Sequence, residues 1–393
     1  MQKRISAYLG LLLAGVLTLA SCRPSSDIHN ATATEEEEVD FRIEYAQNFT
    51  VAQLERGVFH LRIANANGRS NTFYDYMLLN PGATPSDSIL RVAQEGGFTQ
   101  LQLPLQRIIC MTSLQLSNFI ALQVTDHVAG ITSTRHLFDP TMKQQLADGT
   151  TMQIGIEGNF DAEMIMAVSP DVILISPSKR GGFDTLAESG IPVIPHLGYL
   201  ELTPLGQAEW VKLVGLLTGH TADANAYFEN VAREYNRLSK LVKDHLQSNE
   251  CQQPTIMSGD MKGGAWYATG GRSFLAQLFR DAGARYFMDE DTNTGGVNLD
   301  FEVVYAQGAD ADFWRISNSF DGNFSYEQLA QQDARFRDFK SFRNHQVIYC
   351  NMSETPFYES FPVHPDLLLS DFVHIFHPEI LPEHTPAYYY LMK

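Results

Sequence analysis

One segment, residues 222–246, constrains the fold of this 393-residue chain more than any other. It contains neither glycine nor proline, and apolar side chains return at three- and four-residue steps along it, from Tyr227 to Val242. This pattern is typical of a single amphipathic helix. At 1.5 Å per residue the helix would be about 37 Å long, which is enough to run along two domains. We therefore expect it to connect two parts of the chain.

Short apolar runs alternate with helical patterns on both sides of this helix. Before it, candidate strands at 107–110, 128–131, 152–156, 172–175 and 193–194 enclose candidate helices near 114–122, 161–168 and 183–189. After it, strands at 255–257, 311–316 and 346–350 alternate with helices at 274–282, 326–332 and 366–376. Such alternation favours parallel sheets with helices on both faces. The sequence predicts an α/β fold of two Rossmann-like lobes, 107–221 and 249–393, joined by one backbone helix over 222–248.

Residues 41–106 have a different pattern. Apolar and polar residues alternate at 41–45 and 60–63, as in half-buried strands. Asn67-Gly68 and Pro81-Gly82 are typical turn dipeptides. We expect a small β-rich extension that packs on the first lobe.

The N-terminus has the pattern of an export signal. Lys3 and Arg4 precede a mostly apolar run over 7–20, about 21 Å as a helix and too short for a ~30 Å hydrocarbon core. This favours a signal peptide over a membrane span. The run ends in Leu19-Ala20-Ser21-Cys22, which resembles the bacterial lipobox and implies lipidation of Cys22. The alternative is an ordinary signal peptide followed by a chance cysteine.

We therefore expect an envelope protein that is lipid-anchored and faces the periplasm, with exposure on the cell surface as the alternative. Residues 22–40, which include the run Glu35–Glu38, would form a flexible acidic tether. Loss of residues 1–21 removes Lys3 and Arg4 and lowers the formal charge from −18 to −20. So acidic a chain is a poor match for nucleic acid, whose phosphates need a basic surface.

The remaining cysteines, Cys110, Cys251 and Cys350, lie far apart and form no CxxC pair, which argues against a zinc knuckle. An oxidising compartment permits one disulfide, with Cys251 and Cys350 as the preferred pair and Cys110 as a core thiol. His374 and His377 stand three residues apart, but Pro378 follows them directly and ends the helix. We interpret these histidines as structural and predict no metal site.

Catalytic motifs are absent from the sequence. It contains no GxSxG elbow, no P-loop and no GxGxxG after a strand. We therefore predict a binding protein with no catalytic residues rather than an enzyme.

The order and spacing of several segments resemble the substrate-binding lipoproteins of iron-chelate and cobalamin ABC importers, the helical-backbone class III of periplasmic binding proteins. The helix, Pro-Asp and buried strand over Asp161–Ile175 are the most specific piece, and the resemblance covers residues 107–380. The other matching segments are 107–113, 128–132, 189–193, 204–210, 270–274, 281–284 and 377–379.

The resemblance implies a monomer that holds a ferric siderophore, haem or cobalamin between its lobes and delivers it to an ABC permease and ATPase. It implies no cofactor beyond the lipid on Cys22. Two alternatives stay open: a surface lipoprotein that hands its chelate to an outer-membrane receptor, and a chelatase-like enzyme on the same fold. Many members carry a glutamate on each lobe for docking to the permease, whereas this chain has Arg180 and Arg272 at about those positions.

Candidate ligand contacts lie in the loops that follow the predicted strands, because ligands of open α/β sheets bind at the carboxyl ends of strands. Their planar guanidinium groups make the arginines suited to carboxylate, catecholate or phosphate oxygens. For haem, Tyr199, Tyr267 or His136 would be the axial ligand. Each candidate also has a structural interpretation, as a core aromatic or a solvated charge. The candidates are Thr112, Ser113, Arg135, Arg180, Tyr199, Trp266, Tyr267, Trp314, Arg315 and Tyr358.

Overall fold

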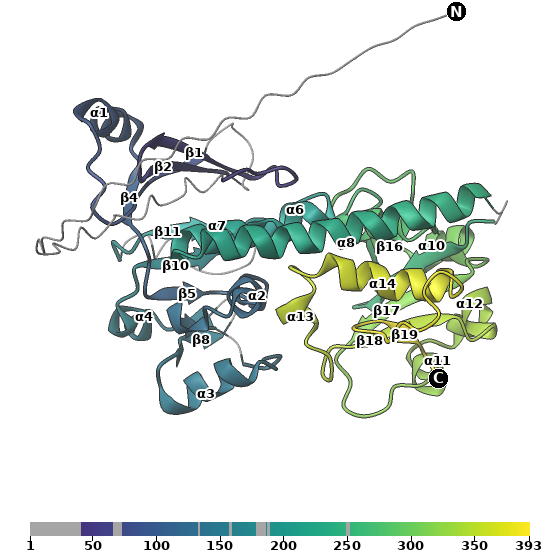
Figure 1. The fold of residues 1–393 in the computed structure, drawn as a ribbon. Helices are drawn as coiled ribbons and strands as arrows, with labels where there is room; N and C mark the ends of the chain where they lie inside the picture. The colour runs from purple at the N-terminus through teal and green to yellow at the C-terminus, as the bar shows by residue number, and fades with distance from the viewer. Residues whose placement is uncertain are drawn as a thin grey trace, which may run out of the picture. The chain divides into compact units, whose positions relative to one another are not determined.

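The longest helix in the described part of the chain is α8 (Thr221–Ser248), drawn in teal in Figure 1. The computed structural model describes residues 41–65, 73–132, 134–156, 159–177, 186, 189–248 and 252–393. That helix packs against α7 (Trp210–Thr218) and α14 (Pro365–Phe376). Its buried side chains recur at mostly three- and four-residue steps and so form one apolar face: Ala224, Phe228, Val231, Ala232, Tyr235, Leu238 and Val242.

Several sequence predictions fall outside the described residues. These are the signal peptide, the lipidation site Cys22, the acidic tether, Arg180 and Cys251. Among the described residues, no helix combines the length and the hydropathy that crossing a bilayer requires.

The first lobe contains a five-stranded parallel sheet in the order β11-β10-β5-β6-β7. Its central strands are wholly buried and rich in β-branched residues, as expected for a sheet covered on both faces. The strands are β5 (Ile108–Cys110), β6 (Val128–Ile131), β7 (Met152–Gln153), β10 (Val172–Ile175) and β11 (Val193–Pro195). The helices include α2 (Ser113–Leu122), α3 (Pro140–Asp148), α4 (Ala162–Val168) and α6 (Pro204–Ala208).

The strand predicted over 152–156 is wrong in its extent. It ends at Gln153, and a separate hairpin follows, formed by β8 (Gly155–Ile156) and β9 (Asn159–Phe160). Gly155 has φ +118°, and a Cβ there would lie 2.6 Å from the Cα of Phe160. Only glycine permits this tight approach, so the chain leaves the sheet at this point.

The second lobe repeats the plan with the strand order β15-β12-β17-β18-β19. The first four strands are parallel and β19 is antiparallel. They are β12 (Thr255–Ser258), β15 (Arg285–Tyr286), β17 (Phe313–Asn318), β18 (Val347–Asn351) and β19 (Tyr390–Leu391). The main helices are α9 (Phe274–Asp281), α10 (Phe301–Gly308), α11 (Tyr326–Gln332), α12 (Lys340–Arg343) and α13 (Phe357–Ser360). The predicted fold class, two α/β lobes with parallel sheets joined by one long helix, is confirmed.

The second lobe also carries a small antiparallel sheet that the sequence analysis missed. It consists of β13 (Asp260–Lys262), β14 (Ala265–Thr269) and β16 (Gly296–Leu299), in the order β13-β14-β16.

The N-terminal extension is a four-stranded sheet in the order β1-β2-β3-β4. Its strands are β1 (Phe49–Glu55), β2 (Val58–Ala64), β3 (Phe73–Leu79) and β4 (Thr99–Gln102), and α1 (Asp87–Gly96) precedes β4. Phe49, Leu61 and Tyr76 belong to the same buried cluster as strands of the first lobe. The Tyr76 hydroxyl donates a 2.6 Å hydrogen bond to the Val193 carbonyl. The extension therefore packs on the first lobe, as predicted.

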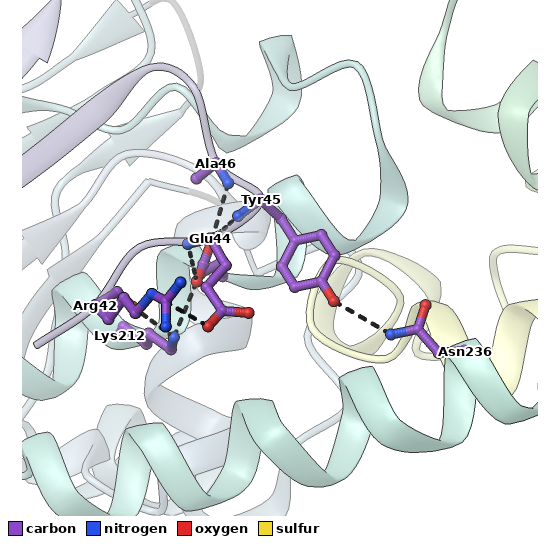
Figure 2. Close-up of polar contacts among 7 residues, drawn as sticks. Arg42, Glu44, Tyr45, Ala46, Lys212 and Asn236 are labelled. Atoms are coloured by element: carbon purple, nitrogen blue, oxygen red, sulfur yellow. Dashed lines mark hydrogen bonds and ion pairs between the residues drawn. The ribbon is translucent and has the colours of Figure 1, made fainter. Parts of the chain in front are cut away.

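A buried carboxylate fixes the segment that leads into this extension. Glu209 is fully buried and accepts hydrogen bonds of 2.7–3.1 Å from the backbone N–H groups of Glu44, Tyr45 and Ala46. Figure 2 shows Lys212 beside these groups. Its Nζ lies 2.9 Å from the Glu209 carboxylate and 2.8 Å from the carbonyl oxygen of Arg42.

Two further contacts extend this attachment. Glu201 accepts from the N–H groups of Gln47 and Asn48, and its burial raises the pKa of its carboxyl. Tyr45 accepts a 3.2 Å hydrogen bond from Asn236 on α8, as Figure 2 shows. The segment over 42–48 is thus bound to both α7 and α8.

The predicted pairing of Cys251 with Cys350 is wrong. Cys350 is a free, fully buried thiol on β18, and Cys110 is a free buried thiol on β5. Burial raises the pKa of Cys350 to about 12 and also raises that of Cys110. Both thiols are therefore protonated and act as small apolar core residues.

Candidate ligand-binding site

Helix α2 covers the carboxyl edge of the first-lobe sheet through a buried polar network. Its residue Gln115 accepts hydrogen bonds from the N–H groups of Met111, at 2.7 Å, and Thr112, at 3.1 Å. The amide of Gln115 donates to the Ser176 hydroxyl, 3.2 Å away and directly after β10. The side chain thus fixes the helix start to the ends of two neighbouring strands.

The same helix contacts the end of β11 through Asn118. Nδ2 of Asn118 lies 3.4 Å from Nε2 of His196, whose ring also packs against Trp210 at a centroid distance of 4.6 Å. Burial lowers the pKa of His196 to about 3, so the imidazole is neutral at pH 7. Polar side chains from α2 and from the residues that follow β10 and β11 therefore form one buried layer at this edge.

One buried polar atom at this edge, Oδ1 of Asn118, has no hydrogen-bond partner within the described residues. Thr112, at the N-terminal end of α2, instead forms a capping box with Gln115. A buried oxygen without a donor costs about 1–3 kcal/mol. A water molecule or a polar group of a ligand would remove that cost.

The second lobe reaches this region through α13. Helix α13 packs against α2. From α13, the buried carboxylate of Glu359 accepts hydrogen bonds from the backbone N–H groups of Phe138, at 2.8 Å, and Asp139, at 3.0 Å. Phe138 and Asp139 belong to the loop between β6 and α3. The two lobes therefore meet at α2, the 134–139 loop and α13, which together form the candidate binding region.

Four of the predicted ligand contacts lie in this region. Thr112 and Ser113 begin α2, Arg135 is exposed in the 134–139 loop, and Tyr358 precedes Glu359 on α13. The Tyr358 side chain is 36% exposed. These residues combine hydroxyl groups, an aromatic ring and a cation, the set that an oxygen-rich or planar anionic ligand requires.

The prediction that Trp266 and Trp314 contact the ligand is wrong. Both side chains are 0% exposed and pack against Phe336 and Phe339 in the core of the second lobe. Their indole N–H groups donate to backbone carbonyls, those of Ser258 at 3.1 Å and Gly259 at 2.9 Å. A ligand has no access to either ring in this structure.

Arg315 is linked to α13 through Tyr389 and makes its own contacts inside the second lobe. Its guanidinium donates to the hydroxyls of Tyr389, at 2.8 Å from Nε, and Ser317, at 3.2 Å. The Tyr389 ring in turn contacts Phe357 of α13, with centroids 5.7 Å apart. Arg315 therefore supports α13 from within the second lobe.

The two remaining described candidates lie on other elements. Tyr267, 44% exposed, stands on β14, and Nζ of Lys262 lies 5.4 Å from its ring centroid. Tyr199 is half-buried against the first-lobe core in a short 3-10 turn, Gly198–Leu200. Three arginines were predicted to share one cleft; of these, Arg135 is exposed, Arg315 is bound within its lobe, and Arg180 lies outside the described residues.

Asn118, His196 and Glu359 were not predicted, and Gln115 and Ser176 were predicted only as members of the loops 112–115 and 176–180, with no role of their own. Gln115 and Asn118 offered a usable signal, because they are amide side chains three positions apart in a helix whose other polar residues are only serines. Nothing in the sequence around Glu359 indicated its role, because its hydrogen-bond partners are more than 200 residues away in the chain.

Comparisons with known proteins agree with this architecture. The family model described as "Periplasmic binding protein" matches residues 108–353. An uncharacterized lipoprotein of Methanocaldococcus jannaschii is 24% identical over 291 residues, which cover 72% of this chain and 67% of that protein.

Among solved structures, a periplasmic haem-binding protein from Pseudomonas aeruginosa has a TM-score of 0.57 at 19% identity. The match covers 72% of this chain and 96% of that one. An ABC-type Fe3+-hydroxamate transport protein from Saccharomonospora viridis has a TM-score of 0.53 at 18% identity, covering 70% and 94%. At these identities the structural matches establish the shared fold.

Proposed function

Because the chain belongs to the periplasmic binding protein family, we propose that it binds an iron chelate, haem or a ferric siderophore, between its two lobes. The observation that carries this proposal is the meeting of α2 and α13, beside a buried Asn118 Oδ1 that has no partner within the described residues. Loops at the carboxyl ends of strands are where open α/β sheets bind their ligands.

The chemistry of the region suits an oxygen-rich chelate. Thr112 and Ser113 offer hydroxyls at a helix N-terminus, where negative oxygens are favoured. Arg135 adds an exposed cation that matches carboxylate or hydroxamate oxygens, and Tyr358 adds an aromatic face. The structural relatives named for haem and Fe3+-hydroxamate support this ligand class. Cobalamin, whose corrin rim carries neutral amides, is the competing ligand.

We further propose that the protein is anchored through a lipid on Cys22 and delivers its ligand to an ABC permease and its ATPase. Support comes from the lipobox-like sequence at 19–22, from the relative named as a lipoprotein, and from the relative named as part of an ABC-type transport system. Delivery requires release of the chelate unchanged, which distinguishes this role from that of a chelatase-like enzyme.

Calorimetric titration tests the ligand class. Purified protein is titrated with haemin, a ferric hydroxamate siderophore, the same siderophore without iron, and cyanocobalamin. The proposal expects saturable 1:1 binding of haemin or of the ferric siderophore, tighter than that of the iron-free siderophore or the corrinoid. Failure of both iron chelates to bind, or a preference for cobalamin, would overturn it.

A further inference from the structure

Three metal-ligating side chains gather where α8 and α14 end, on segments that are distant in sequence. His245 lies in the last turn of α8, His377 follows α14, and Glu379 comes two residues later. One ligand atom from each side chain lies within 4.8 Å of the others. Nε2 of His245 is 2.9 Å from Oε1 of Glu379, and the two imidazole centroids are 5.5 Å apart.

His377 supplies an independent sign of a missing partner. Its side chain is 4% exposed, and its Nε2 makes no hydrogen bond of regular geometry within the described part of the chain. The ring lies directly against Gly283, where a Cβ would come within 2.6 Å of Nε2. The Gly283 backbone is its only neighbouring hydrogen-bond group within the described residues, and the geometry of that contact is irregular. A buried ring nitrogen held in this way carries a desolvation cost, and a bound cation would remove it.

The neighbouring histidines have other partners. Nδ1 of His374 lies 2.7 Å from the Leu381 carbonyl, and Nε2 of His384 lies 2.7 Å from the buried Asp371. The pair noted in the sequence, His374 with His377, is therefore not the pair that converges. His377 converges with His245, which is 132 residues earlier in the chain.

We propose that His245, His377 and Glu379 form a binding site for Zn2+. Two imidazoles and one carboxylate are a donor set that zinc prefers, at bonds of about 2.0–2.2 Å. Tetrahedral coordination would draw the ligand atoms to roughly 3.3 Å from one another. The Glu379 side chain is 55% exposed, so an ion can enter from solvent and water can fill the fourth position.

The predicted consequence is a cross-link between the end of α8 and the segment after α14. At its other end, α14 meets α8 through the Tyr227 hydroxyl, 2.8 Å from Nε2 of His364. Twelve residues separate the two ends of α14, or about 18 Å along the helix. The zinc site is thus remote from α13 and would stabilise the second lobe rather than contact the chelate.

Zinc titration of the purified protein, prepared without a histidine tag, tests the proposal. We expect one Zn2+ per chain with submicromolar affinity, removable by EDTA, and a rise in the melting temperature on zinc addition. His245→Asn should weaken binding at least about 100-fold and Glu379→Gln about tenfold. The control variants His345→Asn and Glu383→Gln, at exposed positions, should leave zinc affinity unchanged.

Co2+ substitution provides a readout of the site itself. The intact site should give the intense visible bands of tetrahedral Co2+, and His245→Asn should abolish them. Circular dichroism of the zinc-free variants checks that they are folded. Absence of submicromolar zinc binding, or binding that survives both His245→Asn and Glu379→Gln unchanged, would overturn the proposal.

Discussion

The carboxylate of Glu359 accepts hydrogen bonds of 2.8 and 3.0 Å from the backbone N–H of Phe138, which lies 221 residues earlier in the chain. Glu359 belongs to the second lobe and Phe138 to the first, so this contact joins the lobes directly beside the candidate binding region. The side chain is 4% exposed, and burial raises the pKa of its carboxyl. A buried carboxylate is retained at little cost only when donors surround it, and here Asp139 supplies a second N–H.

Replacing this carboxylate by an amide should weaken the contact between the lobes. In Glu359→Gln one acceptor oxygen becomes an NH2 group, which faces N–H donors and cannot accept from them. We expect a loss of about 1–3 kcal/mol in the free energy of unfolding, measured by urea denaturation. Glu354→Gln, at an exposed position on the same segment, is the matched control. Equal stability of the two variants would contradict the structural role of Glu359.

The buried imidazole of His196 should make stability depend on pH. Its folded-state pKa of about 3 lies below the ordinary value of 6.5, so between these values the unfolded chain binds a proton that the folded chain does not. Stability should therefore fall as the pH decreases from about 6.5 toward 3, by up to about 1.4 kcal/mol per pH unit.

His196→Phe keeps a ring against Trp210 but removes the titrating group. This variant should show a shallower loss of stability between pH 6.5 and 4 than the unaltered protein, as measured by urea denaturation at each pH. The exposed variant His345→Asn should retain the original slope. An unchanged slope in His196→Phe would rule out His196 as the source of the dependence.

The N-terminal segment should detach when Glu209 is removed. Glu209→Ala leaves Lys212 buried without its carboxylate and three backbone N–H groups without their acceptor. Breaking a buried ion pair costs about 3–5 kcal/mol, and residues 42–48 should become susceptible to limited proteolysis. Glu44→Ala removes only an exposed ion pair with Arg42, at 3.4 Å, and should cost less than about 1 kcal/mol. Equal proteolysis of the two variants would contradict the account.

The second-lobe tryptophans should matter for stability. Trp314→Ala should lower the free energy of unfolding by about 3–5 kcal/mol, because it leaves a cavity beside Phe336 and Phe339. Trp314→Phe should cost less and leave chelate affinity unchanged. Thermal unfolding and the ligand titration measure the two effects separately. A loss of chelate affinity in a folded Trp314→Phe variant would instead indicate that Trp314 contacts the ligand.

The sequence predicted those parts of the fold that depend on local patterns. The backbone helix α8 follows from an apolar repeat without glycine or proline, and the two sheets follow from short buried strands between helices. The tryptophans were misplaced because a strand sends successive side chains to opposite faces. On β14, Trp266 turns into the core and Tyr267 turns outward, and alternation alone does not say which face is covered.

Contacts between segments that are distant in the chain could not be predicted from local sequence patterns. The sequence placed Thr112 and Tyr358 among the candidates because each follows a predicted strand. It gave no indication of Glu359, whose contacts are the N–H groups of Phe138 and Asp139. The same holds for His245 and His377, which tertiary packing alone brings together.

The central claim is that an iron chelate binds where α2 meets α13. Its most direct test is the dissociation constant of haemin and of a ferric hydroxamate siderophore for Arg135→Ala and Tyr358→Ala, with Tyr267→Ala as the exposed aromatic control. The account predicts that each of the first two variants weakens the bound chelate by about tenfold or more, which corresponds to ~1.4 kcal/mol. Tyr267→Ala should bind as the unaltered protein does. Unchanged affinity in Arg135→Ala and Tyr358→Ala, together with loss in Tyr267→Ala, would contradict it.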